Sequence, residues 1–363
     1  MEGTVYVDSA IKGFIESGVI KHSSQEIDEK QIQPSSLDLR CGFGKRIWHM
    51  PYSSIPKGNI MDFLNSRSDY GFDLTEKRFI HKKNVYIIEL EEKLTLPKDI
   101  SAKSNPKSTT GRSDIHTRLI TEDGQSFDDI RRGYEGRLFL EIVSNSFNLF
   151  IPPGHSFNQI RFFNGIGKKL DQGMLEYLAR SESLLLNADG NSIDGEKFIR
   201  DGAVYLTLDL EKTGYKVRDD APAVDLSSGE EFYPASRYFE KVNLNEDGLM
   251  IIPDSFYLLN SKEVVTIPQD HCAEMVDIST TLGEFRAHYA GFFDPYFRDF
   301  GTMEVRNAGN TPFLLRNGQP ISSLVFYALI GKPSEVYGKE RGSHYRGGRV
   351  FPKFFRNDFQ EAT

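Results

Sequence analysis

The stretch Val85-Tyr86-Ile87-Ile88-Glu89-Leu90, followed by Leu94-Thr95-Leu96-Pro97, is rich in branched and aromatic residues and ends at a proline, which predicts a β-strand. The same pattern returns as Phe256-Tyr257-Leu258-Leu259 with Val264-Val265-Thr266-Ile267-Pro268. The spacing is 171 residues, counted from one tyrosine to the other and again between the two prolines. A constant offset between matched landmarks indicates an internal repeat.

Further landmarks recur in the same order along the chain. They pair Ser108-Thr109-Thr110 with Ser279-Thr280-Thr281, Leu138-Phe139-Leu140-Glu141 with Gly301-Thr302-Met303-Glu304, and Gln159-Ile160-Arg161-Phe162-Phe163 with Ser323-Leu324-Val325-Phe326-Tyr327. Short strands between Gly and Pro turns indicate a mainly all-β chain of the sandwich or barrel type, with short helices. We predict a first β domain over residues 1–168, a helical linker over 169–198, and a second β domain over 199–363.

The amino-acid composition limits the classes of function that this chain can have. The 363 residues carry a formal net charge of −8, which argues against general nucleic-acid binding, and they contain neither an apolar run of membrane-spanning length nor a signal peptide. The two cysteines, Cys41 and Cys272, lie far apart and are predicted to be buried thiols in a reducing cytoplasm. The segment 338–357 has six Lys and Arg residues against one Glu, which fits either a solvated tail or a segment that folds over a polyphosphate.

Two stretches carry the candidate chemistry. The run Lys107-Ser108-Thr109-Thr110-Gly111-Arg112 combines hydroxyl groups, a glycine and two cations, which suits a polyphosphate. Glu141 ends an otherwise apolar strand pattern, and Glu304 takes the same place in the second copy. A carboxylate in such a strand is costly unless it is paired or used. We therefore predict either a proton-transfer group or an ion pair, for which Arg137 and Arg306 are nearby candidates.

These motifs, taken in order, resemble the dCTP deaminases of the dUTPase-like superfamily over essentially the whole chain. The resemblance rests on Ile32 to Arg40, Leu94 to Pro97, Lys107 to Arg112, Gly133-Tyr134-Glu135-Gly136, Leu140-Glu141, Pro153-Gly154, Phe293-Asp294-Pro295, Met303 to Asn307, and Tyr337 with His344-Tyr345-Arg346. It implies two tandem dUTPase-like distorted jelly-roll β domains with short flanking helices. It also implies a hydrolase that acts on the C–N bond of a cyclic amidine.

The implied reaction is hydrolytic deamination of dCTP to dUTP and ammonia in pyrimidine deoxynucleotide supply, without a catalytic metal. The resemblance assigns catalysis to Glu141 or Glu304 with Ser108 and Arg112, and substrate binding to Lys107, Thr109, Thr110, Gly111, Asp294, Met303, Tyr337, His344, Tyr345 and Arg346. The last four belong to a C-terminal tail expected to close over the nucleotide. Mg²⁺ is expected to arrive with the triphosphate. The zinc route to base deamination needs a C-x-x-C pair, which this sequence lacks.

The chain departs from the family pattern in each copy. In the first copy the Asp-Pro position reads Arg131-Arg132, although Asp128 and Asp129 come just before it. In the second copy Arg112 has no clean counterpart, and the tail has a histidine, His344, where the family usually offers a lysine. The first copy thus has the arginine but lacks the Asp-Pro aspartate, whereas the second copy has the aspartate but lacks a clean counterpart of the arginine. The choice between the two glutamates therefore stays open, as does the choice between rings of like or mixed domains in the expected threefold homo-oligomer.

Two other functions remain open. The first is dUTP diphosphatase activity, alone or combined with dCTP deamination, since the fold is shared and product identity separates the two reactions. The second is a non-catalytic nucleotide-binding protein in which both copies have lost activity. The expected partner in all cases is a small nucleotide, with no nucleic acid and no membrane.

Overall fold

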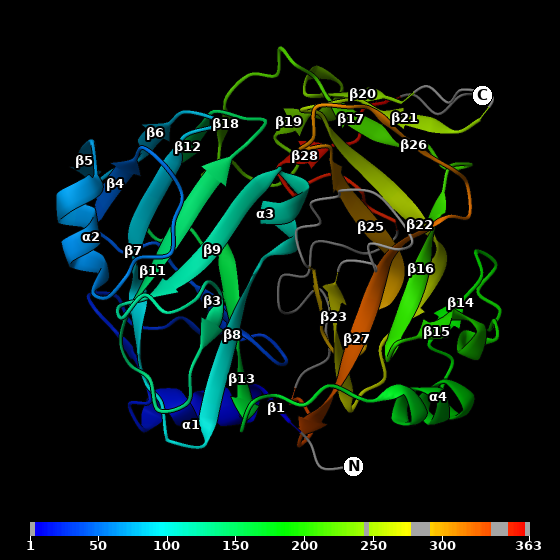
Figure 1. The fold of residues 1–363 in the computed structure, drawn as a ribbon, viewed down its shortest axis with the longest axis horizontal. Helices are drawn as coiled ribbons and strands as arrows, with labels where there is room; N and C mark the ends of the chain where they lie inside the picture. The colour runs from blue at the N-terminus through cyan, green and yellow to red at the C-terminus, as the bar shows by residue number, and fades with distance from the viewer. Residues whose placement is uncertain (1–3, 243–246, 277–290, 335–347, 360–363) are drawn as a thin grey trace. The chain divides into compact units, whose positions relative to one another are not determined.

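The computed structural model describes residues 4–242, 247–276, 291–334 and 348–359. The chain divides into two compact units (Figure 1). The first contains Met1–Lys168 with Ala223–Ser228 and Leu329–Val336, and the second contains Lys169–Pro222, Gly229–Ala328 and Tyr337–Thr363. Both units are built mainly from β-strands, as predicted.

The first unit contains an antiparallel sheet with the strand order β5-β4-β7-β11-β9, and β2 also pairs with β7. Its strands are β2 (Ile20–His22), β4 (Arg46–Met50), β5 (Tyr70–Asp73), β7 (Val85–Thr95), β9 (Ile115–Thr121) and β11 (Glu135–Ser144). Trp48, Ile87 and Phe139 form an apolar cluster on this sheet, and the helix α2 (Ile60–Arg67) contributes Ile60 and Leu64 to it. The sequence reading did not predict this helix, which begins at the Asn59 cap.

The remaining strands of the first unit form two further sheets. One joins β10 (Asp129–Ile130), β8 (Ile100–Pro106), β13 (Asn158–Asn164), β1 (Val5–Tyr6) and β3 (Leu37–Leu39), and the last two residues of β27 (Pro320–Ile330) run parallel to β1. The other has the order β18-β12-β6, formed by β18 (Val224–Asp225), β12 (Leu149–Ile151) and β6 (Arg78–Ile80). The short helices are α1 (Asp8–Glu16), η1 (Glu29–Gln31) and α3 (Ser108–Arg112).

The second unit is organised around β22 (Phe256–Thr266). This strand pairs with β14 (Leu185–Leu186), β16 (Ala203–Asp209), β17 (Tyr215–Val217) and β25 (Arg298–Arg306). Beyond them lie β15 (Ile199–Arg200), β20 (Phe239–Lys241), β23 (His271–Val276), β24 (Phe292–Phe293) and β27. Two separate pairs join β21 (Leu249–Ile251) to β26 (Phe313–Leu315) and β19 (Tyr233–Pro234) to β28 (Phe355–Arg356).

The segment 169–198 lies inside the second unit rather than between the two units. The helix α4 (Gln172–Ser181) is shorter than the predicted helical run, and Leu185–Leu186 forms the strand β14. Leu175, Leu178 and Leu185 are buried in the core of that unit, which explains why the segment packs instead of linking. Two short 3-10 helices, η2 (Gly195–Phe198) and η3 (Ala235–Arg237), complete the second unit.

Strand register repeats between the two units at the offsets expected from the sequence. Leu140 of β11 lies opposite Ile88 of β7, and Met303 of β25 lies opposite Leu259 of β22. Leu259 comes 171 residues after Ile88, the offset found in the sequence. The hydroxyl of Tyr86 accepts a hydrogen bond from the His81 amide at 3.2 Å, and that of Tyr257 accepts one from the Ile252 amide at the same distance. This agreement supports the internal repeat.

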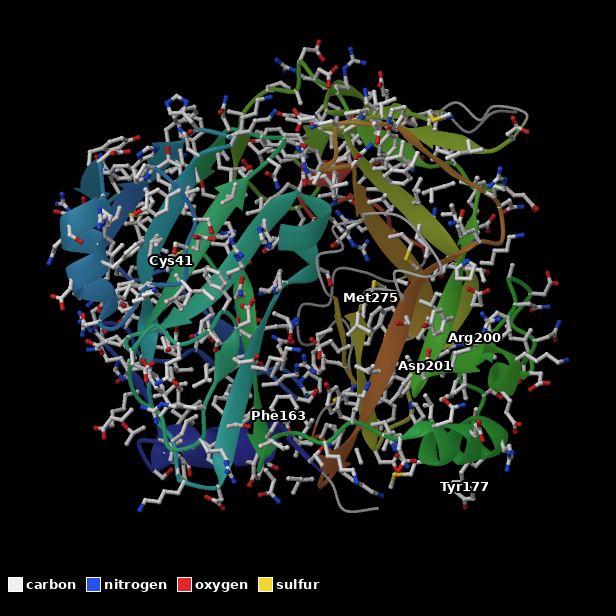
Figure 2. The ribbon with its side chains drawn as sticks, viewed as in Figure 1. Cys41, Phe163, Tyr177, Arg200, Asp201 and Met275 are labelled. Atoms are coloured by element: carbon white, nitrogen blue, oxygen red, sulfur yellow. The ribbon has the colours of Figure 1, made fainter. Side chains whose placement is uncertain are left out.

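Both cysteines are buried free thiols, as predicted, and Cys41 lies within the first unit (Figure 2). Burial raises the pKa of the Cys41 thiol far above its ordinary value. Among the described residues, no helix has the length and apolar character needed to cross a bilayer.

Candidate functional site

Glu141 occupies the middle of β11, between two neighbouring strands. It lies opposite Ile87 of β7 and opposite Arg118 of β9. Because side chains alternate along a strand, Glu141 shares a sheet face with Phe139 and the apolar cluster around it. Its residue surface is only 1% exposed, so the carboxylate has almost no access to water.

One oxygen of Glu141 is held by an arginine and a serine. Glu141 Oε1 accepts hydrogen bonds from Arg118 Nε at 3.1 Å, from Arg118 Nη2 at 2.9 Å and from the Ser53 hydroxyl at 2.9 Å. The guanidinium carbon of Arg118 also lies 4.0 Å from the centre of the Phe127 ring. Glu141 Oε2 is buried and has no hydrogen-bond partner among the described residues. Arg118 and Ser53 therefore fix the position of this carboxylate.

The arginine that pairs with Glu141 is not the one predicted. Arg137 lies on the same strand but pairs with Glu122 at 2.6 Å and with Glu89 at 3.5 Å. Residues two or four apart on one strand share a face but project in parallel, whereas directly opposed residues on adjacent strands converge. The cross-strand neighbour Arg118 is therefore the closer partner for Glu141.

The predicted phosphate-binding run forms the short helix α3, with Lys107 at its N-cap. The Lys107 ammonium pairs with the Asp38 carboxylate, and the Thr110 hydroxyl donates to the Phe157 carbonyl at 2.7 Å. Thr110, Gly111 and Arg112 are buried, whereas Ser108 and Thr109 are half-buried. The structure therefore holds these six residues together as one turn rather than as an open loop.

Glu304 lies on β25, opposite Leu258 of β22. This pairing matches that of Glu141 with Ile87, so the two glutamates occupy the same register position in their units. Glu304 is 7% exposed, and Met303 beside it is fully buried. The nearby Arg306, predicted as a possible partner, forms an ion pair with Asp254.

Asp294, predicted to read the sugar, directly follows β24 and is buried. Its backbone carbonyl accepts a hydrogen bond from the Phe297 amide at 3.2 Å, which closes a turn. The tail residues Tyr337, His344, Tyr345 and Arg346 lie outside the described residues. The segment that follows them, 348–359, is anchored in the second unit by β28 and by the buried ring of Phe355.

Two titratable groups near β9 have shifted pKa values. Burial raises the pKa of Asp128 to about 7, opposed in part by the hydrogen bond that its carboxylate accepts from the Leu119 amide at 2.9 Å. Burial and the positive charge of Arg118 lower the pKa of His116 to about 4, so this imidazole is neutral at pH 7. Asp128 thus connects its own segment to β9 through the Leu119 amide.

Sequence reasoning missed Arg118 and Ser53, the two residues that contact Glu141. A signal for Arg118 was present, because His116, Arg118 and Ile120 alternate with Thr117 and Leu119 as expected on a strand. Ser53 lies in an irregular segment with no pattern that points to β11. No group of three or more His, Cys, Asp or Glu within the described part of the chain is placed to hold a metal ion.

Family models match both halves of the chain. The 2'-deoxycytidine 5'-triphosphate deaminase N-terminal domain matches residues 2–166, and the C-terminal domain of the same family matches residues 171–355. The chain belongs to the dCTP deaminase family. A crystal structure of 2'-deoxycytidine 5'-triphosphate deaminase from Agrobacterium tumefaciens is 32% identical, with a TM-score of 0.82, and the match covers 92% of this chain and 100% of that one.

Curated relatives in the family match over shorter stretches. A protein named "dCTP deaminase, dUMP-forming" from Methanosphaera stadtmanae is 31% identical over 159 residues, which are 43% of this chain and 79% of that protein. One of the same name from Halobacterium salinarum is 36% identical over 110 residues, which are 30% of this chain and 56% of that protein. A "dCTP deaminase" from Haloarcula marismortui is 37% identical over 116 residues, 31% of this chain and 59% of that protein. The chain thus spans little more than half the length of two of these three relatives.

Proposed function

We propose that this chain catalyses the hydrolytic deamination of dCTP to dUTP and ammonia, with Glu304 as the general acid–base. The observation that carries the proposal is the shared register of Glu304 and Glu141, which are buried strand glutamates at the same position in the two halves of a dCTP deaminase chain. Family membership supports the substrate.

The chemistry requires a group that accepts and returns protons. Water attacks C4 of cytosine while the glutamate takes a proton from it, and N3 receives a proton as the tetrahedral intermediate forms. The C4–N4 bond then breaks, and the amino group leaves as ammonia after gaining a proton. A single carboxylate can perform all these transfers if it exchanges protons readily near the working pH.

The contacts of Glu141 favour Glu304 for this role. Arg118 and Ser53 both donate to Oε1 of Glu141, so a reacting water or nucleobase at that oxygen would have to displace a partner that the carboxylate already holds. Glu141 is also the more buried of the two, at 1% exposure against 7% for Glu304. We therefore assign Glu141 to a structural ion pair and Glu304 to catalysis, with Met303 and Asp294 of the same half as substrate-binding residues.

The remaining roles follow the family assignment. Lys107, Ser108, Thr109 and Arg112 would bind the phosphates and the base, and Mg²⁺ would arrive with the triphosphate. The Lys107–Asp38 ion pair must then loosen, or share the ammonium, when phosphate binds. Zinc independence and a homo-oligomer with a threefold arrangement of β domains are part of the same proposal.

The test measures ammonia and pyrophosphate release from dCTP with Mg²⁺ for wild type, Glu304→Gln and Glu141→Gln. We expect Glu304→Gln to lower ammonia release by at least about 100-fold, the contribution expected of a general acid–base. We expect Glu141→Gln to retain activity within several-fold of wild type. Loss of activity in Glu141→Gln alone would reverse the assignment, and unchanged activity in both would contradict the glutamate mechanism.

A second candidate is favoured by the names of two relatives, which are called dUMP-forming. In that case dUTP would be hydrolysed further to dUMP and pyrophosphate. Wild-type release of pyrophosphate in equal amount to ammonia would establish this reaction, and ammonia alone would exclude it. If wild type releases neither product, the chain is a nucleotide-binding protein without this activity.

A further inference from the structure

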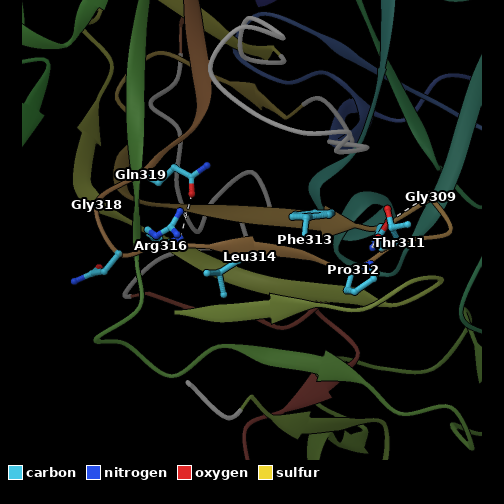
Figure 3. Close-up of a pocket in the computed structure, with 10 residues that line it drawn as sticks. Gly309, Thr311, Pro312, Phe313, Leu314, Arg316, Gly318 and Gln319 are labelled. Carbon is cyan, nitrogen blue, oxygen red and sulfur yellow. Dashed lines mark hydrogen bonds between the residues drawn. The ribbon is translucent and has the colours of Figure 1, made fainter. Parts of the chain in front are cut away.

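The strand β26 in the second unit has one paired edge and one edge that faces a groove. It pairs with β21, and the sheet formed by these strands has no third member among the described residues. The groove has a volume of about 770 Å³, and two residues of β26, Phe313 and Leu314, are among those that line it (Figure 3). Its lining is formed by Asn307, Gly309, Thr311, Pro312, Phe313, Leu314, Arg316, Asn317, Gly318 and Gln319.

The equivalent strand in the first unit, β12, is paired on both edges. It pairs with β6 on one side and with β18, which runs parallel to it, on the other. The Val224 amide donates to the Asn148 carbonyl at 2.9 Å, and the Leu226 amide donates to the Phe150 carbonyl at 3.0 Å. An extended segment thus completes this sheet by adding one strand.

The two strands match residue by residue. Leu149 lies opposite Ile80 and Phe313 lies opposite Ile251, so the offset is 164 residues for β12 and β26 and 171 for their partners. A polar side chain closes the preceding turn in each unit. The Ser144 hydroxyl donates to the Phe147 carbonyl, and Asn307 donates to the Thr311 carbonyl at 2.9 Å.

This match identifies the hydrogen-bonding groups on the groove side of β26. Pro312 and Leu314 correspond to Asn148 and Phe150, whose carbonyls accept from the added segment. The Leu315 carbonyl lies on the opposite side, since a Cβ built on Gly248 would lie 2.2 Å from it. Successive carbonyls along a strand point to opposite edges, so the Leu314 carbonyl and amide face the groove.

The lining also indicates the charge of an occupant. Among its ten residues Arg316 is the one charged group, and it is exposed. Leu314 and Phe313 are half-buried and supply apolar contact. A segment that runs parallel to β26 and donates a backbone hydrogen bond to the Leu314 carbonyl would reach Arg316 about two residues later.

We propose that the groove-side edge of β26, unpaired among the described residues, binds an extended peptide segment of a partner protein by strand addition, parallel to β26 and with a carboxylate at its C-terminal end facing Arg316. Main-chain hydrogen bonds to an exposed edge supply affinity in this recognition mode, and side-chain pockets supply selectivity. The segment β18 on β12 is the template for this geometry. The inference is independent of the deaminase activity, because none of the assigned catalytic residues lines the groove.

The probe is a fluorescent peptide with the sequence of residues 221–228 and a free C-terminal carboxylate. Anisotropy titration with the full chain should give saturable binding. N-methylation of the peptide leucine that corresponds to Leu226 removes the donor to Leu314 and should weaken binding at least 10-fold. Amidation of the peptide C-terminus, or Arg316→Gln in the protein, should weaken binding several-fold through loss of the charge pair.

A protein variant locates the binding edge. Leu314→Pro removes an amide that faces the groove and leaves the β21 side intact, and proline is tolerated on such an edge. It should lower affinity at least 10-fold with unchanged circular dichroism. Binding that is insensitive to both Leu314→Pro and the N-methyl group would overturn the proposal, since the peptide would then bind at β12 or elsewhere. A change in oligomeric mass of Leu314→Pro without peptide would also overturn it, because the occupant would be a second copy of the chain.

Discussion

The ion pair between Arg118 and Glu141 allows a sharp prediction about stability. Glu141 is 1% exposed, whereas the side chain of Arg118 is 28% exposed. Removal of Arg118, as in Arg118→Met, would leave a buried carboxylate with Ser53 as its remaining donor. Removal of the charge on Glu141, as in Glu141→Gln, would leave a guanidinium that can still reach water. We therefore expect the two substitutions to have unequal costs.

Breaking a buried ion pair by removal of one partner costs roughly 3–5 kcal/mol. Because Arg118 is partly solvated, we expect the low end of this range, about 3 kcal/mol, for Arg118→Met. For a unit of this size that corresponds to a decrease of about 6–12 °C in Tm. Glu141→Gln keeps an acceptor for Arg118 and Ser53, so we expect a cost below about 1 kcal/mol. The double variant should be more stable than Arg118→Met alone.

The single tryptophan makes the assay specific to this unit. Trp48 is buried in the apolar cluster on the same sheet as Glu141, so its fluorescence reports unfolding of the first unit. Unfolding in urea, followed by this signal, gives the free energy for wild type, both single variants and the double variant. We expect Arg118→Met to lose more unfolding free energy than Glu141→Gln. Equal losses of unfolding free energy in the two single variants, or a loss in the double variant equal to their sum, would refute this expectation.

Three further predictions concern stability. The pKa of Asp128 is raised to about 7, so the folded state holds a proton that the unfolded chain loses near pH 4, and the free energy of unfolding falls as pH rises from 4 to 7. The free energy of unfolding of Asp128→Asn, measured in urea, should therefore equal that of wild type near pH 4 and exceed it by roughly 2–4 kcal/mol at pH 8. Gly248 has φ +139° and sits against the Leu315 carbonyl, so Gly248→Ala should cost more than about 2 kcal/mol and lower Tm. Phe355 is 1% exposed, so Phe355→Ala should cost about 3–5 kcal/mol, whereas Phe232→Ala at a 61% exposed ring should stay within about 0.5 kcal/mol; because both rings lie in the second unit, unfolding is followed by far-UV circular dichroism instead of Trp48 fluorescence.

Much of the fold was predictable because strand periodicity and turn residues are local signals. The strands around Val85, Arg137 and Gln159 were predicted within a few residues, as was the helix α1. The run from Lys107 to Arg112 was predicted as a phosphate-binding stretch from its hydroxyl groups, glycine and cations, and no helix was assigned to it. Its helical turn is supported by a tertiary contact, the hydrogen bond from Thr110 to the Phe157 carbonyl, which local sequence does not encode.

The contacts of the candidate site were harder to predict than its residues. Glu141 was predicted from its apolar strand and Glu304 from the internal repeat, and both are buried. The partner of Glu141 depends on the register between β9 and β11, so a shift of one residue would turn Arg118 to the other face. Register is a property of two strands together, and one strand's pattern does not contain it.

The two glutamates share a register position but need not share a function. A structural carboxylate benefits from fixed partners, and the hydrogen bonds from Arg118 and Ser53 supply these for Glu141. A general acid–base must change its protonation state in every turnover, which a strong ion pair opposes. Different measurements therefore distinguish the structural role from the catalytic one. Arg118→Met should move the Trp48 unfolding transition, whereas Glu304→Gln should abolish ammonia release and leave that transition in place.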